Sequence, residues 1–231
     1  MDRVELNILE EFKQDFKKIK EMGFIDSKRL HDTGIGKTFE DFIGVIENNK
    51  AFADYKGIIE LKSGRELSQS MITLFTKSPE PKKINNILRE EYGYYDGEHR
   101  DMKILHTTIV ADKFNTCKGK FAFILDINGK EEKVNIKIKN MENNYVEDVD
   151  IYYSFETLRK IIDKKCKYII FISAETKKDR GKELFKFSKA ILLSGLTFEK
   201  FLDALKNGII KYDVRIGVYR TGKLKGKTHD H

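Results

Sequence analysis

Residues 57–63 read Gly-Ile-Ile-Glu-Leu-Lys-Ser, and the rest of the fold is worked out from this stretch. Its alternation predicts a strand over residues 57–62, with Glu60 and Lys62 on one face and Ile59 and Leu61 on the other. Because apolar residues surround the two charges, we expect the strand to be largely buried. Burying charges that have no role is costly, so the pattern indicates that Glu60 and Lys62 do chemical work.

Helices and strands alternate along the remainder of the chain. Apolar spacing predicts helices over 2–21, 38–49, 82–92, 181–194 and 197–207, with a Gly-bearing turn at 33–36, and strands at 105–112, 120–127, 133–139, 167–174 and 209–219. Without internal repeats, this order predicts an α/β fold with a mixed β-sheet flanked by helices. No obvious linker divides the chain, and we place a lobe boundary near residue 112, between lobes 1–112 and 113–231.

Composition narrows the class of protein. The 231 residues suffice for one large domain or two lobes, and a net charge of +7 with 35% charged residues favours a polyanionic partner. Cys117 and Cys166 lack metal-ligand spacing, which argues against a zinc site and fits a reduced, cytoplasmic protein. The charged N-terminus and the lack of a long apolar stretch predict no secretion signal and no membrane association.

Asp54 and the Glu60-x-Lys62 pair form the strongest chemical signal. Phosphodiester hydrolysis needs a hydroxide at neutral pH and neutralisation of developing negative charge, and a hard divalent cation held by carboxylates supplies both. Asp54 and Glu60 are therefore candidate ligands for Mg²⁺, with Mn²⁺ as a substitute. Lys62 can orient the attacking water or stabilise the transition state, and Glu40 can add a carboxylate contact. Taken alone, the spacing favours a solvated strand face in a chain with this many charged residues.

The C-terminal segment is strongly basic. Residues 211–228 carry six Lys or Arg side chains against Asp213 alone, a net charge of +5. On the expected strand, Asp213 and Arg215 share a face. Arg can pair bidentately with guanine and Asp can accept from the cytosine amino group, so the pair can read a G·C pair. A solubilising tail with a local Asp–Arg pair is the alternative.

Residues 36–38, Gly-Lys-Thr, are similar to the end of a nucleotide-binding P-loop. That pattern requires a glycine where this chain has His31. We therefore expect no nucleotide cofactor.

Several blocks of the sequence resemble the MvaI/BcnI restriction endonucleases. They are residues 33–40, Thr-Gly-Ile-Gly-Lys-Thr-Phe-Glu; Asp54 with residues 57–63; residues 70–79, Ser-Met-Ile-Thr-Leu-Phe-Thr-Lys-Ser-Pro; residues 212–219, Tyr-Asp-Val-Arg-Ile-Gly-Val-Tyr; and residues 226–231. MutH-like nickases of mismatch repair share the Glu…Asp…Glu-x-Lys part. The block at 70–79 favours the MvaI/BcnI enzymes.

This resemblance implies a PD-(D/E)xK nuclease fold, bilobed, with a DNA cleft between catalytic and recognition lobes. It implies that Glu40, Asp54, Glu60 and Lys62 are catalytic and that Asp54 and Glu60 hold the metal. The residues expected to contact DNA are Asp213, Arg215, Arg220, His229, Asp230, His231, Thr73 and Lys77. Two departures are Ala53, where the family usually has proline, and the chain end at His231, before the family's usual Phe-Arg pair. We therefore expect an incomplete recognition end.

The expected function is type II restriction: Mg²⁺-dependent cleavage of double-stranded DNA at a short CC-x-GG-like site. The resemblance further implies a monomer that nicks one strand at a time. Three alternatives remain open at this point. They are a MutH-like strand-directed nickase, a non-catalytic DNA-binding module that uses the basic C-terminal strand, and an α/β protein that is merely basic.

Overall fold

The computed structural model describes residues 1–29, 33–45, 52–66 and 71–230. The chain divides into two compact units, the first made of Met1–Phe75 with Ile161–Thr197 and the second of Thr76–Lys160 with Phe198–His231. Each unit therefore contains two separate stretches of chain. The boundary expected near residue 112 does not separate them, because that residue lies inside the second unit.

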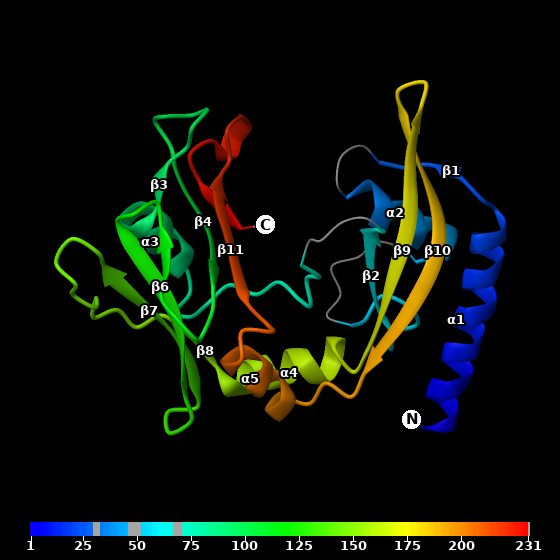
Figure 1. The fold of residues 1–231 in the computed structure, drawn as a ribbon, viewed down its shortest axis with the longest axis horizontal. Coiled ribbons are helices and arrows are strands. Elements are labelled where there is room, and N and C mark those ends of the chain that lie inside the picture. Colours follow the sequence, from blue (N-terminus) through cyan, green and yellow to red (C-terminus); the bar gives the residue numbers. More distant parts are fainter. Residues whose placement is uncertain (30–32, 46–51, 67–70, 231) are drawn as a thin grey trace. The chain divides into compact units, whose positions relative to one another are not determined.

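The first unit contains a four-stranded mixed sheet, with strands in the order β1-β10-β9-β2. The strands are β1 (Ile25–Asp26), β2 (Glu60–Arg65), β9 (Tyr168–Asp179) and β10 (Lys182–Ser194). β2 runs parallel to β9, whereas β10 pairs antiparallel with both β9 and β1 (Figure 1). The predicted mixed sheet is confirmed.

Two helices pack on this sheet. α1 (Arg3–Glu21) lies along β10 and α2 (Gly34–Phe42) packs on β2 (Figure 1). Phe12 on α1 and Phe39 on α2 meet Phe187 of β10 in a buried aromatic cluster. The helix expected over 2–21 is confirmed. The second helix begins earlier than expected, because the glycine segment forms its first turn, and it ends at Phe42, so the helix expected as far as residue 49 is wrong for residues 43–45. Residues 46–49 lie outside the described residues.

The helix expected over 181–194 is wrong, because this segment is strand β10. Phe185 and Phe187 are both buried with Lys186 between them, which is a period of two. β9 pairs with β10 along its whole length, so the tertiary partner overrides the helical preference of the local sequence. Helix α4 (Phe155–Lys165), which the sequence analysis did not predict, leads from the second unit into the first.

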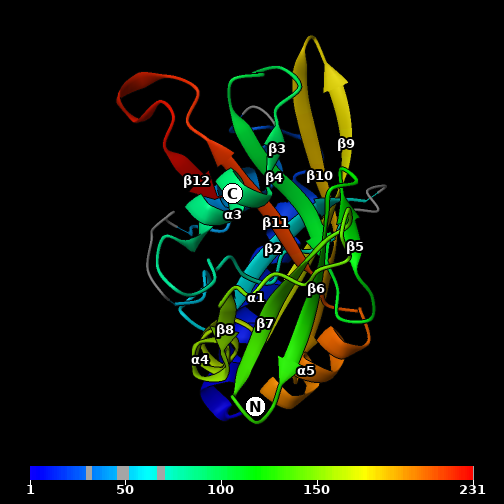
Figure 2. The ribbon, with the colours of Figure 1, turned by 90° about the vertical axis from the view of Figure 1, so that its left-hand side faces the viewer.

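The second unit has two antiparallel four-stranded sheets, ordered β12-β11-β4-β3 and β5-β6-β7-β8 (Figure 2). The elements are α3 (Ile84–Tyr92), β3 (Tyr94–Tyr95), β4 (Lys103–Ile109), β5 (Asn115–Cys117), β6 (Phe121–Asn128), β7 (Lys133–Asn140), β8 (Tyr152–Ser154), α5 (Phe198–Lys206), β11 (Tyr212–Val218), the 3₁₀ turn η1 (Gly222–Leu224) and β12 (Thr228–Asp230). The strands and helices predicted here are confirmed to within a few residues. No helix in the described part of the chain is long and apolar enough to cross a membrane.

Glu5 ties the start of α1 to β9. Asp2 and Glu5 form a capping box, in which each side chain accepts from the other residue's backbone N–H. The buried Glu5 carboxylate also accepts from the Tyr168 hydroxyl at 2.9 Å and from the Lys167 ammonium. The hydrogen bond from Lys167, followed by those from Asp2 and Tyr168, lowers the pKa of Glu5 to about 2.

We expect Glu5→Gln to lower the thermal stability of the protein at neutral pH. The folded-state pKa is depressed, so the stabilisation is present above the unfolded value near 4.5 and is lost as the pH falls toward 2. Thermal unfolding followed between pH 7 and pH 3 should therefore show the difference from the wild type narrowing below about 4.5. Glu21→Gln, the same change at an exposed position of α1, is the control. A difference that does not vary with pH contradicts this account.

Candidate functional site

A tight turn ahead of β2 presents Asp54. Lys56 and Gly57 have φ angles of 51° and 72°, which reverse the chain, and the Tyr55 backbone N–H donates to the Ile59 carbonyl at 2.9 Å. Residues 57–59 therefore face residues 53–55, and the strand expected from residue 57 begins at Glu60. Tyr55 is buried and its hydroxyl donates to Asp15 of α1 at 2.9 Å, which leaves the neighbouring Asp54 exposed.

The Asp54 carboxylate is held at the beginning of β2. Its Oδ2 atom accepts from the Leu61 backbone N–H at 3.0 Å. Because Leu61 is adjacent to Glu60, this bond brings the two carboxylate residues to the same end of the strand. The structure thus places Asp54 beside the backbone that follows Glu60, and a shared metal site of the two carboxylates stays a prediction.

Glu60 is 3% exposed and pairs with Lys62 on its own strand. Lys62 Nζ donates to Glu60 Oε1 at 2.8 Å, which confirms that the two side chains share one face. A second ammonium, that of Lys165 at the end of α4, lies 3.9 Å from the same oxygen. Sequence reasoning missed Lys165 because no local pattern connects α4 with β2. Two cations therefore compensate one buried carboxylate.

The other oxygen of Glu60, Oε2, is buried and has no hydrogen-bond partner in the described part of the chain. An unsatisfied, buried, charged acceptor costs free energy, and such atoms are rare outside ligand sites. Carboxylate oxygens are the donors that Mg²⁺ prefers, and Mg²⁺ needs only one or two protein carboxylates because it keeps several waters. The chemistry of Asp54 and Glu60 therefore fits this ion.

Cys166 lies next to this site and has an unreactive thiol. Its thiol is buried, and burial together with the nearby Glu60 charge raises its pKa to about 11. The thiol is therefore protonated at neutral pH, which makes it a poor nucleophile.

Glu40 lies half-buried on α2, the helix that packs on β2. Within the described ranges, no three Asp, Glu, His or Cys side chains gather closely enough to hold a metal ion. Glu40 thus lies on the helix that packs against β2 and does not form one ligand cluster with Asp54 and Glu60. Its predicted role as a supporting carboxylate stays a prediction.

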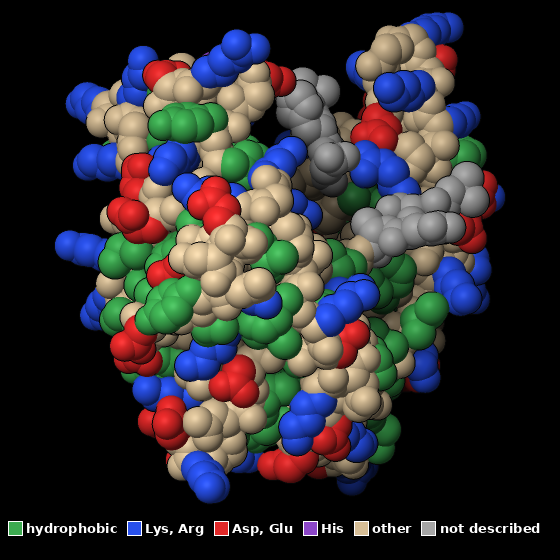
Figure 3. Space-filling view, turned by 60° about the vertical axis from the view of Figure 1, so that its left-hand side comes forward, with side chains coloured by type: hydrophobic (Ala, Val, Ile, Leu, Met, Phe, Trp, Pro, Cys, Tyr) green, Lys and Arg blue, Asp and Glu red, His purple; other side chains and the backbone are tan. Residues whose placement is uncertain are grey.

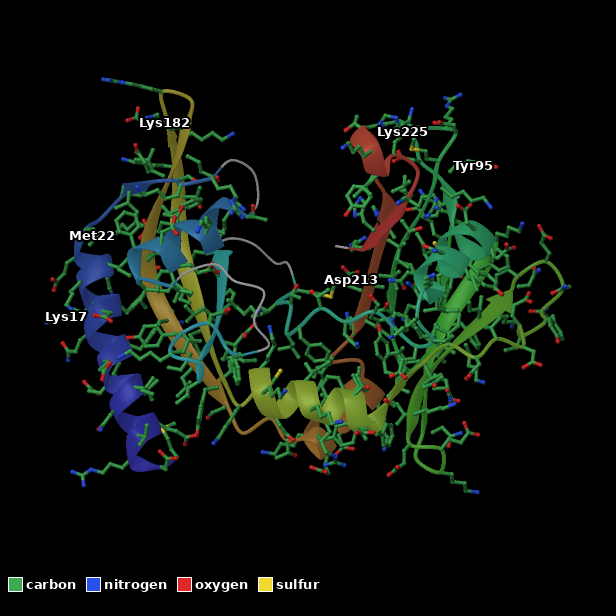
Figure 4. All side chains as sticks on the ribbon, turned by 180° about the vertical axis from the view of Figure 1, so that it is seen from behind. Lys17, Met22, Tyr95, Lys182, Asp213 and Lys225 are labelled. Atoms are coloured by element: carbon green, nitrogen blue, oxygen red, sulfur yellow. The ribbon has the colours of Figure 1, made fainter. Side chains whose placement is uncertain are left out.

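In the second unit, Asp213 and Arg215 share one face of β11 as predicted, and Asp213 is labelled on that strand in Figure 4. Asp213 Oδ1 accepts from the Thr108 hydroxyl of β4 at 2.8 Å, and Oδ2 accepts from Arg215 Nε at 2.9 Å. Val214 and Ile216 are buried on the opposite face. The sheet therefore presents a fixed acidic and basic pair.

β12 extends this sheet and carries His229. His229 pairs with Gly217 of β11, and the centre of its ring lies 4.6 Å from that of the Tyr219 ring. Asp230 pairs with Ile216 through the backbone, and His231 lies outside the described residues. Arg89 of α3, which the sequence analysis did not single out, is buried and donates to Thr228 Oγ1 at 3.0 Å, so it holds β12 in place.

Three further residues expected to contact DNA are Arg220, Thr73 and Lys77. Arg220 pairs with Asp96 at 2.8 Å and Glu98 at 3.3 Å. The Glu98 backbone N–H, and then the Arg220 charge, lower the pKa of Asp96. Thr73 and Lys77 are exposed in a segment without regular structure. Thr73 belongs to the first unit and Lys77 to the second.

Positive and negative side chains are mixed on one face of the molecule. On the face drawn in Figure 3, Lys and Arg side chains are interspersed with Asp and Glu, despite the net charge of +7. Function must therefore be argued from the individual side chains and their contacts.

Comparison with known proteins gives one family and two solved structures. The model of the MvaI/BcnI restriction endonuclease family matches residues 13–231. A solved complex of restriction endonuclease MvaI with its cognate DNA substrate is 36% identical, with a TM-score of 0.89, and the match covers 100% of this chain and 91% of that one. MvaI in the absence of DNA is 34% identical, with a TM-score of 0.61 and coverages of 100% and 90%. No curated protein matches.

The predicted mixed α/β fold of a restriction endonuclease is therefore confirmed, and so is the resemblance seen in the sequence. The family match extends over the segments that carry Asp54, Glu60, Lys62, Asp213 and Arg215. The chain belongs to the MvaI/BcnI restriction endonuclease family.

Proposed function

We propose that this chain is a type II restriction endonuclease that hydrolyses phosphodiester bonds in double-stranded DNA with Mg²⁺, for which Mn²⁺ can substitute. The observation that carries the proposal is the buried Glu60 carboxylate, with one oxygen held by Lys62 and the other without a partner in the described part of the chain. Membership of a restriction endonuclease family supports it. We also propose that the enzyme acts in the cytoplasm.

Asp54 and Glu60 are the residues that would hold the ion. When bound, Mg²⁺ supplies Lewis-acid stabilisation of the phosphate charge and a more acidic water. Lys62, fixed 2.8 Å from Glu60, places a positive charge beside the reacting phosphate without needing to reorganise. Glu40 on the adjacent helix supports the site.

Sequence recognition is proposed to use Asp213 and Arg215. Arg215 pairs with guanine and Asp213 accepts from the cytosine amino group, which suits a G·C-flanked site of the CC-x-GG type. His229 lies on the neighbouring strand β12 and is proposed as a further contact. We propose that the enzyme acts as a monomer that nicks one strand at a time.

Divalent cations should stabilise the wild-type protein. A ligand that binds only the folded state raises stability by about 2.7 kcal/mol at 100 times its dissociation constant. We expect Mn²⁺ or Mg²⁺ to raise the melting temperature of the wild type and to have a much smaller effect on Glu60→Gln. Glu66→Gln, an exposed carboxylate shortly after β2, should respond as the wild type does. A full metal-dependent shift in Glu60→Gln would rule out Glu60 as a ligand.

Lys62→Ala should abolish cleavage and leave specific DNA binding intact. Loss of one preorganised charge-stabilising group costs roughly 10²–10³ in rate, and Lys62 also compensates the buried Glu60. Plasmid digestion with Mg²⁺, followed by run-off sequencing of the ends, measures the rate and locates the cut for the wild type. Binding without hydrolysis by the wild type would instead indicate a non-catalytic module. Retained cleavage by Lys62→Ala would remove the lysine from the mechanism.

Arg215→Ala should relax discrimination at one base pair by about 1–3 kcal/mol, because it removes a bidentate guanine contact. Lys223→Ala, at an exposed position of the same basic segment, should weaken binding equally for all sequences. Competition binding with a set of duplexes, each altered at one base pair, separates these effects. Equal losses on every duplex would mean that Arg215 contacts only the backbone.

A further inference from the structure

β9 and β10 continue as a two-stranded hairpin beyond the end of β2. β2 pairs with β9 only from Ile169 to Ala174, whereas β9 and β10 remain paired as far as Asp179 and Lys182. Figure 1 shows this hairpin in yellow. Residues 176–182 are all exposed. The segment therefore contributes to neither the core nor the catalytic cluster of its unit.

The tip of this hairpin, residues 177–182, is basic. It carries Lys177, Lys178, Arg180 and Lys182 against Asp179, a net charge of +3 on six residues. Lys182 lies 3.7 Å from Asp26, and Lys177 lies over the Phe24 ring at 4.3 Å. Lys178 and Arg180 form no ion pair with any described residue, so their charges are available to a partner.

The hairpin is also preorganised. Arg180 and Gly181, the two residues of the turn, have φ angles of 48° and 81°, which match the twist of a two-residue hairpin. Below the tip, Arg65 of β2 donates to Glu183 Oε1 at 2.9 Å and 3.2 Å through two nitrogens. β1 pairs with β10 at Leu184 and Phe185. A partner would therefore bind a preformed surface, with little ordering cost.

The chemistry of the tip favours a polyanion as the partner. Residues 176–182 contain no aliphatic or aromatic side chain, so the tip lacks the apolar anchors of protein interfaces and of membrane-surface segments. We propose that this hairpin tip binds phosphates of the DNA duplex outside the recognition sequence. This inference rests on the proposed function, because it assumes that the same unit holds the cutting site on DNA.

The position of the tip indicates which phosphates it reaches. Lys62 pairs with Phe171, and Arg180 lies nine residues further along β9. At about 3.3 Å per residue this is roughly 30 Å. Successive phosphates of one strand are about 3.4 Å apart along the axis, so the tip lies roughly nine base pairs from the cut if it follows the duplex. The contact is therefore independent of the bases that are read.

The test compares the double variant Lys178→Gln, Arg180→Gln with the wild type on two duplexes. Both duplexes carry the same recognition site, one with flanks of about 3 base pairs and one with flanks of about 12, and Ca²⁺ replaces Mg²⁺ to prevent cleavage. On the long duplex we expect a roughly tenfold loss of affinity, and a fall of about two in the slope of log K against log salt. On the short duplex the variant and the wild type should bind alike.

Lys17→Gln, Lys20→Gln, the same charge change on exposed positions of α1, is the matched control (Figure 4 labels Lys17). It should keep the wild-type affinity and salt slope. An unchanged slope in the hairpin variant, or an equal loss in the control, overturns the proposal. Normal cleavage of the short duplex by the hairpin variant shows that it is folded. If the wild type cuts DNA and the hairpin variant loses no affinity for the long duplex, the hairpin contact alone is refuted. If the wild type neither cuts nor binds DNA, the proposed function is refuted.

Discussion

The buried carboxylate of Glu60 is the constraint on which the first unit depends. Burying a charge is costly unless cations and hydrogen bonds compensate it, and here Lys62 and Lys165 both approach one of its oxygens. These lysines come from β2 and from the end of α4, about a hundred residues apart in the sequence. They meet because β2 and β9 are parallel neighbours, and parallel strands need a long crossover connection. In this chain, most of the second unit occupies that connection.

Features that depend only on local periodicity were predictable from the sequence. Glu60 and Lys62 share a face because residues two apart on a strand always do, and the same rule places Asp213 beside Arg215. α1 was predictable because its apolar stripe and its capping box both depend on residues that are close together in the sequence. The choice of Glu40 came from family resemblance, and it remains the catalytic candidate with the least support from geometry.

Features that depend on distant partners were not predictable. Lys182–Ser194 becomes a strand because β9 lies beside it, and nothing in the local sequence predicts that pairing. Lys165 joins Glu60, and Arg89 supports β12, through pairings made across long stretches of sequence. The division into units failed for the same reason, since each unit is assembled from two separated stretches of chain. Asp54 lies between these two cases. Its turn is local, because it depends on the positive φ angles of Lys56 and Gly57. Its hydrogen bond from the Leu61 backbone N–H is seen only in the folded structure.

In the proposed function, cutting and reading belong to different sheets, and the chemistry of Asp213 and Arg215 suits reading. Asp213 accepts one bond on each oxygen, from Thr108 and Arg215, yet a carboxylate has about four acceptor sites. It can therefore still accept from a base amino group. The contact described for Arg215 uses Nε, and its guanidinium has further N–H groups that can face guanine. The pair is thus oriented in the absence of DNA, so binding would order few side chains, and a wrong base would leave fixed polar groups without partners. Such a mismatch is penalised more heavily than the loss of a contact from a mobile side chain.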